Sequence, residues 1–511
     1  MHTNQPAGLP CSNSSASFWH SEPNAFLYGH RTTADLPAKA DIVIVGSGIT
    51  GASVARFLAA DSRASKLSIV MLEAREICWG ATGRNGGHCQ PLLFDRTPDV
   101  AGFEVKNVHA VKSYIDEHNV PCEWRSVTGC RSFWTAESFN AAKTEVEQLA
   151  KANKDLASKV SLIEHGDAKT MKQHRVNPNA KGVTLTQGAG QLWPYKYVTF
   201  IVEKLVRESM INVQTNTPVK KIETMTDSQY RQQLTTPRGQ ISARHVILAT
   251  NGYTSHLLNG FTDLIVPVRC EMSALHPPPG SERLPNSYGM VGFENGNIDH
   301  DDYLIQRPFY DSSNGDGTRR GGHLMFGGGR SFAMYNCIGE TDDDIVDPGE
   351  ADYLRRALLQ MLELEGETEG MKELKASHQW TGIKGYSRDN MPWVGKVPSQ
   401  ENNESFENGL WLCGGYTGHG MPNATLCGKA VVEMVLAEEQ GNTNYESICE
   451  KLVKDQDIPQ IYLITHDRLK AAHGLPSVVE QDAAGGVHAV ASLKKKPNEP
   501  MAVRTSKCTS M

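Results

Sequence analysis

The chain has 511 residues, a formal net charge of -7, and 39% hydrophobic and 21% charged residues. Its length favours two joined domains, and its composition is ordinary for a globular protein. The acidic balance disfavours nucleic acid as the main partner. Eleven scattered cysteines in so long a chain do not resemble a disulfide framework. With a polar N-terminus and no long apolar run, we expect no secretory signal, no membrane span and a cytoplasmic location.

The first recognisable unit along the chain is a strand, a glycine-rich turn, a helix and a second strand. Residues 1–40 are polar and irregular, and we expect them to form a leader on the surface. The β-branched run 41–45 is typical of a strand that is buried on both faces. A helix with small residues follows up to about Ala60, and a second strand spans 67–72. This is a βαβ unit of about 30 residues.

Later segments alternate between helical and strand patterns. The spacing of apolar residues predicts mainly helical structure over 101–165, including a helix over 136–149, and another helix from Pro194. A strand is expected at 245–249, mixed strands and loops over 262–335, and a helix over 351–364. A strand at 410–413 precedes a helix over 422–436, for which Pro422 suits the first position.

These patterns predict an α/β protein in which a Rossmann-type domain is interleaved with an α+β substrate domain that has a mixed or antiparallel sheet. The expected boundaries are a leader at 1–40, a discontinuous nucleotide-binding domain at 41–100, 190–260 and 375–440, a substrate domain at 101–189 and 261–374, and a C-terminal extension at 441–511. Periodicity is lost after about 465, and the Lys494–Lys496 region predicts a disordered tail.

The turn after the first strand reads Gly46-Ser47-Gly48-Ile49-Thr50-Gly51. The first glycine permits a tight turn, the second lets backbone N–H groups approach a pyrophosphate, and the third lets the helix pack closely on the strand. The helix N-terminus adds partial positive charge. Glu73 ends the second strand about 20 residues further on, where a carboxylate accepts hydrogen bonds from ribose hydroxyls and repels a 2'-phosphate.

Three further glycine-rich or small polar segments favour FAD over NAD. They are Gly80–His88, Thr250-Asn251-Gly252 and Gly414–Met421. The first suits a cofactor that extends beyond the first phosphate site. The last precedes a second helix, and its backbone amides are suited to a flavin edge on which negative charge develops.

Together these motifs resemble the FAD-dependent D-amino-acid oxidase superfamily among the glutathione-reductase-like flavoproteins. The sub-pattern is most similar to gamma-glutamylputrescine oxidases and related amine oxidases of fungi and bacteria. The residues that carry the resemblance are GSGITG at 46–51, EAREICWGATGRNGGH at 73–88, VILATNGY at 246–253, WTGIKGYSRDNMPWVG at 380–395 and GGYTGHGM at 414–421. The resemblance covers roughly residues 17–440.

The resemblance implies a set of FAD-binding residues and no metal. They are Gly46, Ser47, Gly48, Ile49, Thr50, Gly51, Glu73, Ala74, Arg75, Thr82, Arg84, Asn85, Gly86, Gly87, Thr250, Asn251, Gly252, Gly382, Gly415, Tyr416, Gly418, His419, Gly420 and Met421.

The family comparison also bears on flavin attachment. Sarcosine oxidase-like relatives link FAD to a Cys seven residues before an Asp, and the matching positions here are Gly382 and Asp389. Dimethylglycine dehydrogenase-like relatives use a His, which Arg84 replaces here. We therefore expect non-covalent FAD. A link through Cys413 is the alternative, and its ordinary interpretation is a small buried residue that ends a strand.

Four residues are candidates for catalysis. Arg84 is suited to stabilising reduced flavin or a substrate carboxylate, and His88 to accepting a proton from a substrate ammonium. Arg330, after three glycines, is suited to an acidic substrate group, and Lys384 to promoting oxygen reduction. The competing interpretations are a loop ion pair for Arg84, a packed histidine for His88, and solvated surface positions for the other two.

The resemblance implies oxidation of the C–N bond of an amine or amino acid, with hydride passing to the flavin and oxygen reduced to hydrogen peroxide. The expected partners are therefore a small amine and oxygen, with the oligomeric state open. One alternative is an FAD-dependent oxidase or dehydrogenase of a specialised metabolite, and another is a flavin-binding protein without turnover. No nucleophile–base triad motif is found, which fits a reaction whose electronic demands the flavin meets.

Overall fold

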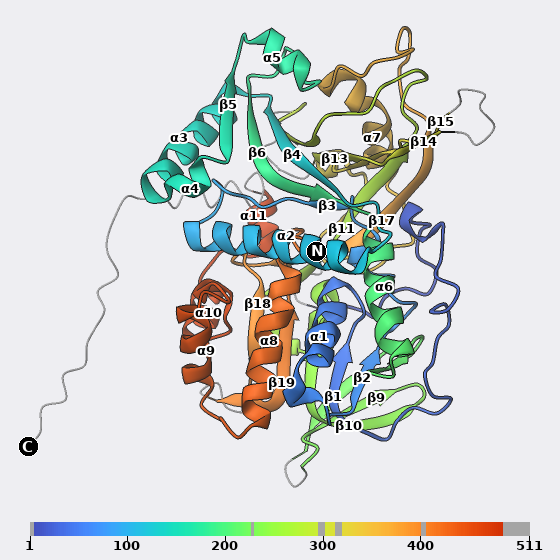
Figure 1. The fold of residues 1–511 in the computed structure, drawn as a ribbon, viewed down its shortest axis with the longest axis vertical. Helices are drawn as coiled ribbons and strands as arrows, with labels where there is room; N and C mark the ends of the chain where they lie inside the picture. The colour runs from blue at the N-terminus through green and yellow to red at the C-terminus, as the bar shows by residue number, and fades with distance from the viewer. Residues whose placement is uncertain (1–4, 226–228, 295–301, 312–318, 400–404, 484–511) are drawn as a thin grey trace, which may run out of the picture.

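The computed structural model describes residues 5–225, 229–294, 302–311, 319–399 and 405–483. The chain forms two stacked halves, each built on one large sheet, and α2 (Pro98–His118) runs between them (Figure 1). Segments from the beginning, middle and end of the chain meet in the lower half of Figure 1. The two halves are thus interleaved in sequence.

The lower half contains an eight-stranded sheet with the order β18-β19-β10-β1-β2-β7 and a β8–β9 hairpin beside β10. Its strands are β1 (Lys39–Val45), β2 (Ile69–Leu72), β7 (Asn212–Gln214), β8 (Lys221–Thr224), β9 (Gln232–Thr236), β10 (Gly239–Leu248), β18 (Trp393–Pro398) and β19 (Phe406–Gly414). The pairs β1–β2, β1–β10, β2–β7 and β10–β19 are parallel. This parallel core confirms the predicted α/β fold class.

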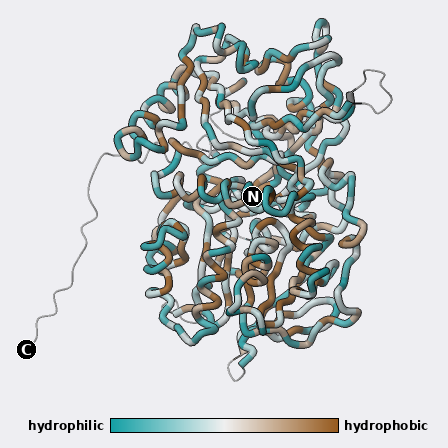
Figure 2. Tube along the Cα trace, viewed as in Figure 1, coloured by the Kyte–Doolittle hydropathy of each residue, from teal (hydrophilic) through white to brown (hydrophobic). Residues whose placement is uncertain are grey.

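Alternating side chains of β1 are buried in two different cores. Ile42 and Ile44 pack into the core shared with α1 (Ile49–Ala60), α6 (Pro194–Arg207) and α8 (Ala424–Glu439), whereas Val43 and Val45 pack on the opposite face of the sheet. The apolar residues of this half accordingly gather along the strands and the helices against them (Figure 2). Burial on both faces explains why the strand is a continuous β-branched run.

The upper half contains a nine-stranded sheet with the order β17-β11-β16-β13-β12-β4-β6-β3, with β5 beside β6. Its strands are β3 (His88–Cys89), β4 (Arg125–Phe133), β5 (Val160–Glu164), β6 (Gly182–Gln191), β11 (Ile265–Leu275), β12 (Ser287–Val291), β13 (Asp302–Gln306), β16 (Leu324–Gly327) and β17 (Ala376–Ser387). Every pairing is antiparallel except β12–β4, so the predicted mixed sheet is confirmed.

The remaining elements of the upper half lie around this sheet. They are the helices α3 (Ala136–Ala152), α4 (Lys154–Ala157), α5 (Ala168–Gln173) and α7 (Pro348–Met361), and the short β14 (Phe309–Asp311) and β15 (Arg319–Gly321). Helix α7 is packed against the sheet through Leu354, Ala357 and Leu358, which are completely buried.

Two predicted boundaries differ from the structure. The strand β17 lies within the segment that we assigned to the nucleotide-binding domain, yet it pairs with β11 along its length in the upper sheet. The segment 101–165 is not wholly helical, because β4 and β5 lie within it and pair with β6. In both cases long-range strand pairing decides the structure, and local periodicity does not report it.

The leader is packed into the molecule, contrary to our expectation of a surface segment. Trp19 and Leu27 are almost completely buried, and a 3-10 helix, η1, spans Phe18–His20. The Trp193 indole N–H donates to the Trp19 carbonyl at 2.8 Å. Residue Ser15 donates its backbone N–H to the carbonyl of Asp343 at 2.8 Å. The leader is polar in composition, but burial of its large aromatic side chains decides where the segment lies.

Up to residue 483, the C-terminal extension contains the α-helices α9 (Tyr445–Lys454), α10 (His466–His473) and α11 (Val478–Ala483). Arg468 of α10 pairs with Asp389 at 2.8 Å, which fixes a helix that lacks an apolar stripe. Structure thus continues past residue 465, where the sequence suggested its loss. The predicted disordered tail around Lys494–Lys496 lies outside the described residues.

Candidate active site

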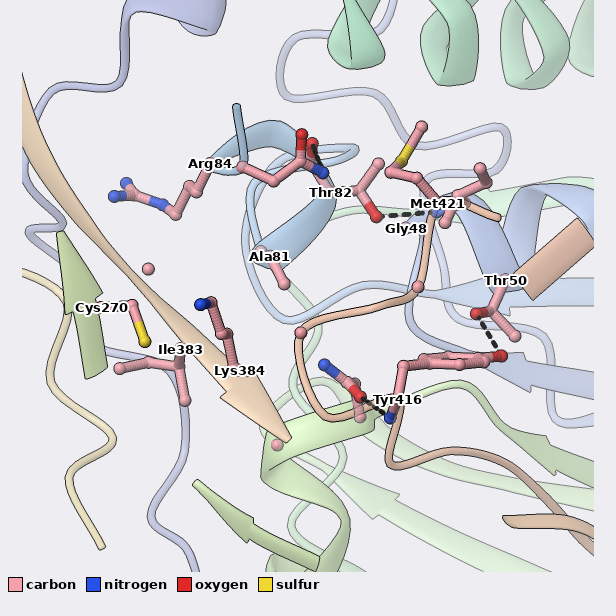
Figure 3. Close-up of a pocket in the computed structure, with 18 of the residues that line it drawn as sticks. Gly48, Thr50, Ala81, Thr82, Arg84, Cys270, Ile383, Lys384, Tyr416 and Met421 are labelled. Atoms are coloured by element: carbon pink, nitrogen blue, oxygen red, sulfur yellow. Dashed lines mark hydrogen bonds between the residues drawn. The ribbon is translucent and has the colours of Figure 1, made fainter. Parts of the chain in front are cut away.

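A cavity of about 330 Å³ lies where the two halves meet. The lower half contributes the turns after β1, β2 and β10 and the loop after β19, and the upper half contributes β4, β11 and β17. Figure 3 shows Thr50, Tyr416 and Met421 on one side, and Cys270, Ile383 and Lys384 on the other. The cavity therefore joins a nucleotide-binding framework to the second sheet.

The turn after β1 leaves no room for a side chain at its three glycine positions. A Cβ on Gly46, whose φ is 104°, would lie 2.7 Å from the Ala249 carbonyl oxygen. A Cβ on Gly51 would lie 2.0 Å from the Gly46 carbonyl oxygen, and one on Gly48 would lie 3.0 Å from Thr82 Oγ1. The Thr82 hydroxyl also accepts the Ile49 N–H at 3.0 Å, which joins the two glycine-rich segments. This geometry matches the role that we predicted for each glycine.

Glu73 is held at the end of β2 by backbone and hydroxyl donors. Its Oε2 accepts from the Ser47 N–H at 3.0 Å and the Ser47 hydroxyl at 2.6 Å, and its Oε1 accepts from the Arg75 N–H at 2.9 Å. A carboxylate offers about four acceptor positions, so Oε1 keeps capacity for a further donor. The acid lines the cavity, as ribose recognition requires.

Arg75 and Arg84 share one buried acid. The Arg75 guanidinium donates to both Asp343 oxygens at 2.8 and 3.0 Å, and Arg84 Nε lies 3.1 Å from Asp343 Oδ2. Burial alone would raise the pKa of Asp343. The hydrogen bonds from Arg75 and the positive charge of both arginines outweigh burial and keep this pKa below its ordinary value. The acid comes from a loop of the upper half and ties that loop to the nucleotide-binding half.

The Arg84 guanidinium is turned toward protein acceptors. Besides Asp343 it donates to the carbonyl groups of Trp79, Thr381 and Ser15 at 3.0, 2.6 and 2.8 Å. Burial, the largest cause, and the charge of Arg75 together lower its pKa to about 10, against the opposing effect of Asp343. These contacts correspond to the ion-pair interpretation and leave little donor capacity for a substrate carboxylate. Arg84 orders the loop that lines the cavity.

His88 also lines the cavity and is electrically neutral over the physiological range. Burial, with smaller contributions from His419 and Arg131, lowers its pKa to about 3. Its Nε2 lies 2.9 Å from the Ser287 hydroxyl. A group with this pKa is a poor acceptor for the proton of an ammonium, so the electrostatics favour the packed-histidine interpretation over the general base.

The loop after β19 is held by the turn after β10. Asn251 Oδ1 accepts the N–H groups of Gly415 and Tyr416 at 3.1 and 3.4 Å. The hydroxyl groups of Tyr416 and Thr50 lie 3.0 Å apart. A Cβ on Gly418 would lie 3.6 Å from Lys384 Nζ, so the lysine reaches this loop from β17. The loop therefore brings Tyr416 and Gly418 to the part of the cavity that Lys384 reaches.

The ring of His419 contacts a buried acid of α2. Its Nε2 lies 3.2 Å from Glu104 Oε2 in α2. Burial alone would raise the pKa of Glu104, but His419, Arg96 and the Leu92 N–H outweigh it and hold the pKa below its ordinary value. The ion pair fixes α2 against the loop.

Most of the predicted site residues line this cavity. Those that do not are Gly51, Gly87, Gly415 and Arg330. The three glycines act through close packing or positive φ, because Gly87 and Gly415 have φ of 73° and 75°. Arg330 lies in η6 (Arg330–Phe332) and pairs with Asp482 of α11 at 3.2 Å, so the structure does not support its contact with substrate.

The two cysteines relevant to flavin attachment differ in position. Cys413 is completely buried, its Sγ lies 3.3 Å from the Tyr416 hydroxyl, and it does not line the cavity. Cys270 lines the cavity and lies directly opposite Gly382 in the β11–β17 ladder. Sequence reasoning missed Cys270 because strand pairing alone brings it to Gly382.

Three further groups escaped the sequence analysis: Asp343, the pair Asp95 and Arg131, and Arg96. Asp343 stands in the acidic run Asp342–Asp344, and the pattern of an acid run in a loop is more typical of solvated residues. The others have no motif spacing. Only tertiary structure brings Asp95, Arg96 and Arg131 to the cavity, and Asp343 to the two arginines that line it.

The comparisons with known proteins identify the family. Residues 41–434 match the model of the family described as FAD dependent oxidoreductase. This chain belongs to the FAD-dependent oxidoreductase family. The family assignment confirms the predicted resemblance, the enzyme class and FAD as the cofactor.

Proteins similar to this FAD-dependent oxidoreductase match most of its length. It is 24% identical over 425 residues to a probable oxidoreductase OrdL of Rhizobium meliloti (strain 1021), covering 78% of this chain and 84% of the relative. It is 22% identical over 418 residues to the gamma-glutamylputrescine oxidoreductase of Escherichia coli (strain K12), with the same coverage. The structure of glycine oxidase from Geobacillus kaustophilus has the same fold, with a TM-score of 0.58 at 18% identity, covering 80% of this chain and 96% of that one.

The residues of this FAD-dependent oxidoreductase fit its cofactor. The glycine turn after β1 is closed to any Cβ, as close approach of a pyrophosphate requires, and Glu73 keeps an acceptor position for a ribose hydroxyl. Within the described part of the chain, no group of His, Cys, Asp or Glu is arranged to hold a metal ion. No helix in that same part is long and apolar enough to cross a membrane.

Proposed function

We propose that this FAD-dependent oxidoreductase is an amine oxidase. The overall reaction is R–CH2–NH–R' + O2 + H2O → R–CHO + R'–NH2 + H2O2. The observation that carries the proposal is the cavity itself, in which the FAD-binding turns face a polar and charged surface of the second sheet. The relatives named gamma-glutamylputrescine oxidoreductase and glycine oxidase support a nitrogen-bearing substrate.

Bound FAD supplies the two-electron acceptor for C–N oxidation and the route of the electrons to oxygen. The chain supplies position and charge. Lys384 places a positive charge beside the loop after β19, and this charge favours negative charge that develops in that part of the cavity. The proposed role of Lys384 in oxygen reduction rests on this placement.

The protonation state of the substrate follows from the chemistry of hydride transfer. Cations (Lys384, Arg96, Arg131) and acids (Asp95, Asp302) both line the cavity, so the lining does not select the ammonium form by charge alone. His88 is neutral with a pKa of about 3 and does not take up the released proton at neutral pH. Loss of hydride from the carbon next to nitrogen needs the nitrogen lone pair, so the amine is oxidised in its neutral form, with the proton lost to solvent before or during binding.

The proposal is tested by oxygen uptake with a panel of primary amines, secondary amines and amino acids, and with hydroxy acids as the control class. We expect one nitrogen-bearing class to consume oxygen and to yield one hydrogen peroxide for each carbonyl product. Oxidation of the hydroxy acids alone would contradict the proposal. Carbonyl formation with an added dye acceptor but without peroxide would retain C–N oxidation and exclude the oxidase assignment.

A further inference from the structure

Part of the leader forms one wall of the cavity. Leu9 and Pro10 line it, although both precede residues 41–434, which the family model matches. The two residues are partly buried, whereas Gly8 on one side and Ser12 on the other are exposed. This segment therefore turns one face to the cavity and the other to solvent.

One end of this segment is anchored on η4 (Asn251–His256), the 3-10 helix that follows β10. Ala7 is buried, its N–H donates to Ser255 Oγ at 2.9 Å, and its carbonyl oxygen lies 3.2 Å from His256 Nδ1. Asn251, at the start of the same helix, holds the loop after β19. The anchor thus rests on an element that already shapes the cavity.

The other end is anchored on the two arginines after β2. The Cys11 carbonyl accepts from Arg75 Nη1 at 3.3 Å, and the Ser15 carbonyl accepts from Arg84 Nη2 at 2.8 Å. Asp343 adds two contacts, because its Oδ1 accepts from the Cys11 thiol at 2.9 Å and its carbonyl accepts from the Ser15 N–H at 2.8 Å. Most of these contacts use backbone groups of the leader, so they fix the path of its chain.

The anchors determine which part of the cavity this wall borders. Leu9 and Pro10 lie between η4 and Arg75, and Arg75 follows Glu73 by two residues. Glu73 keeps an acceptor position for a ribose hydroxyl, so this end of the cavity fits the ADP half of FAD. Apolar side chains are the usual lining of a cofactor site. The leader thus borders the part of the site that fits the nucleotide.

We infer that residues 7–15, here called the strap, close the FAD site beside the ADP half of the cofactor, and that the strap detaches before FAD enters or leaves. Leu9 and Pro10 supply the wall, and the two anchors set its position. The docked strap tightens FAD binding, and bound FAD keeps the strap docked, because such a coupling is reciprocal. The inference concerns retention of the cofactor and does not depend on amine oxidation.

The first test measures FAD release from the holoenzyme. Dilution starts the release, and the rise in flavin fluorescence gives its rate constant. The double variant Leu9→Gly/Pro10→Gly removes both side chains of the wall and the φ restriction of proline, so the strap detaches more readily. We expect release at least about tenfold faster than in the wild type. Pro23→Gly, at an exposed leader proline outside the cavity, is the matched control, and its rate should stay within about twofold.

The second test reports detachment of the strap through the thiol of Cys11. Burial and the hydrogen bond to Asp343 raise the pKa of this thiol to about 12, so the docked thiol reacts slowly with iodoacetamide. Detachment removes both effects. Mass spectrometry of the Cys11 peptide measures labelling of the holoenzyme in excess FAD and after dilution. We expect excess FAD to slow wild-type labelling at least about fivefold, and we expect the double variant in excess FAD to react at least about tenfold faster than the wild type.

The two measurements together decide the role of the strap. Faster FAD release accompanied by faster Cys11 labelling supports the inference. Equal release from the wild type and the double variant would overturn it. Faster release without faster labelling would also overturn it, since the wall would then act without detaching. Neither test requires turnover, so failure of every amine to reduce the flavin would refute the proposed function alone.

Discussion

Asp343 accepts two hydrogen bonds from the Arg75 guanidinium, from Nη1 to Oδ1 at 2.8 Å and from Nη2 to Oδ2 at 3.0 Å. Both side chains are almost completely buried, and the two residues are 268 positions apart in the sequence. The pair connects the turn after β2 to a loop of the other half. It joins the two halves beside the cavity that Arg75 lines.

The first prediction concerns this connection. Asp343→Asn removes the single charge that compensates two buried guanidinium groups, Arg75 and Arg84, and we expect a loss of about 3 kcal/mol or more in the free energy of unfolding. We also expect weaker retention of FAD, measured as the flavin-to-protein ratio after gel filtration. Asp344→Asn is the matched control, because Asp344 is exposed. Equal stability and flavin content in both variants would contradict this role.

The second prediction concerns flavin attachment. We expect acid precipitation of the purified protein to release all of the yellow chromophore into the supernatant, because Gly382 and Arg84 occupy the family's attachment positions and Cys413 does not line the cavity. Absorbance of supernatant and pellet measures the partition. Flavin that stays with the protein would show a covalent link, and loss of that link in Cys270→Ser would assign it to the thiol opposite Gly382.

The third prediction concerns the buried acid Glu271 of β11. Burial raises its pKa to about 9, so it is protonated in the folded protein at neutral pH and ionised in the unfolded chain above its ordinary pKa of 4.5. Its Oε2 accepts the Asp347 N–H at 3.0 Å, whereas its Oε1 has no hydrogen-bond partner among the described residues. The folded state therefore binds the extra proton, and its stability falls as pH rises from about 4.5 toward 9.

Glu271→Gln removes this proton dependence while keeping the side-chain shape. We expect the variant to gain stability relative to the wild type as pH rises from 5 to 9, by at most about 1.4 kcal/mol per pH unit. Denaturant unfolding of both proteins at each pH provides the measurement. A parallel pH dependence of the two proteins would show that Glu271 is ionised in the folded state.

The fourth prediction concerns His88. Since its pKa is lowered to about 3, it does not change charge between pH 5.5 and 9. His88→Gln is therefore expected to leave the shape of the pH profile of flavin reduction unchanged. The rate should change by no more than about tenfold, in line with one altered hydrogen bond to Ser287. A wild-type limb near pH 6.5 that disappears in the variant would instead identify His88 as a catalytic base.

The parts of the molecule that local sequence determines were predictable. The unit β1–α1–β2, the glycine turn and Glu73 lie within about 30 residues, and their chemistry requires those residue types at that spacing. Helix α8 begins at Ala424, two positions after the predicted Pro422, because Asn423 occupies the N-cap. Such differences at helix ends are small.

The residues that complete the site depend on long-range contacts. Asp343 reaches Arg75 only through the packing of the two halves, and the leader joins them through Trp19 and Ser15. The cavity wall that Leu9 and Pro10 form depends on the contacts that hold the two ends of the strap. A single sequence contains no periodic signal for such contacts. By contrast, Arg330 had a suggestive glycine-rich context but pairs with Asp482.

The central claim is that this FAD-dependent oxidoreductase removes two electrons from a C–N bond. The most direct measurement is the visible spectrum of the holoenzyme while amines of each class are added without oxygen, followed by admission of air. The account predicts that one class bleaches the flavin bands completely and that air restores them with formation of hydrogen peroxide. Flavin bands that persist with every amine, in protein whose flavin dithionite still reduces, would contradict it.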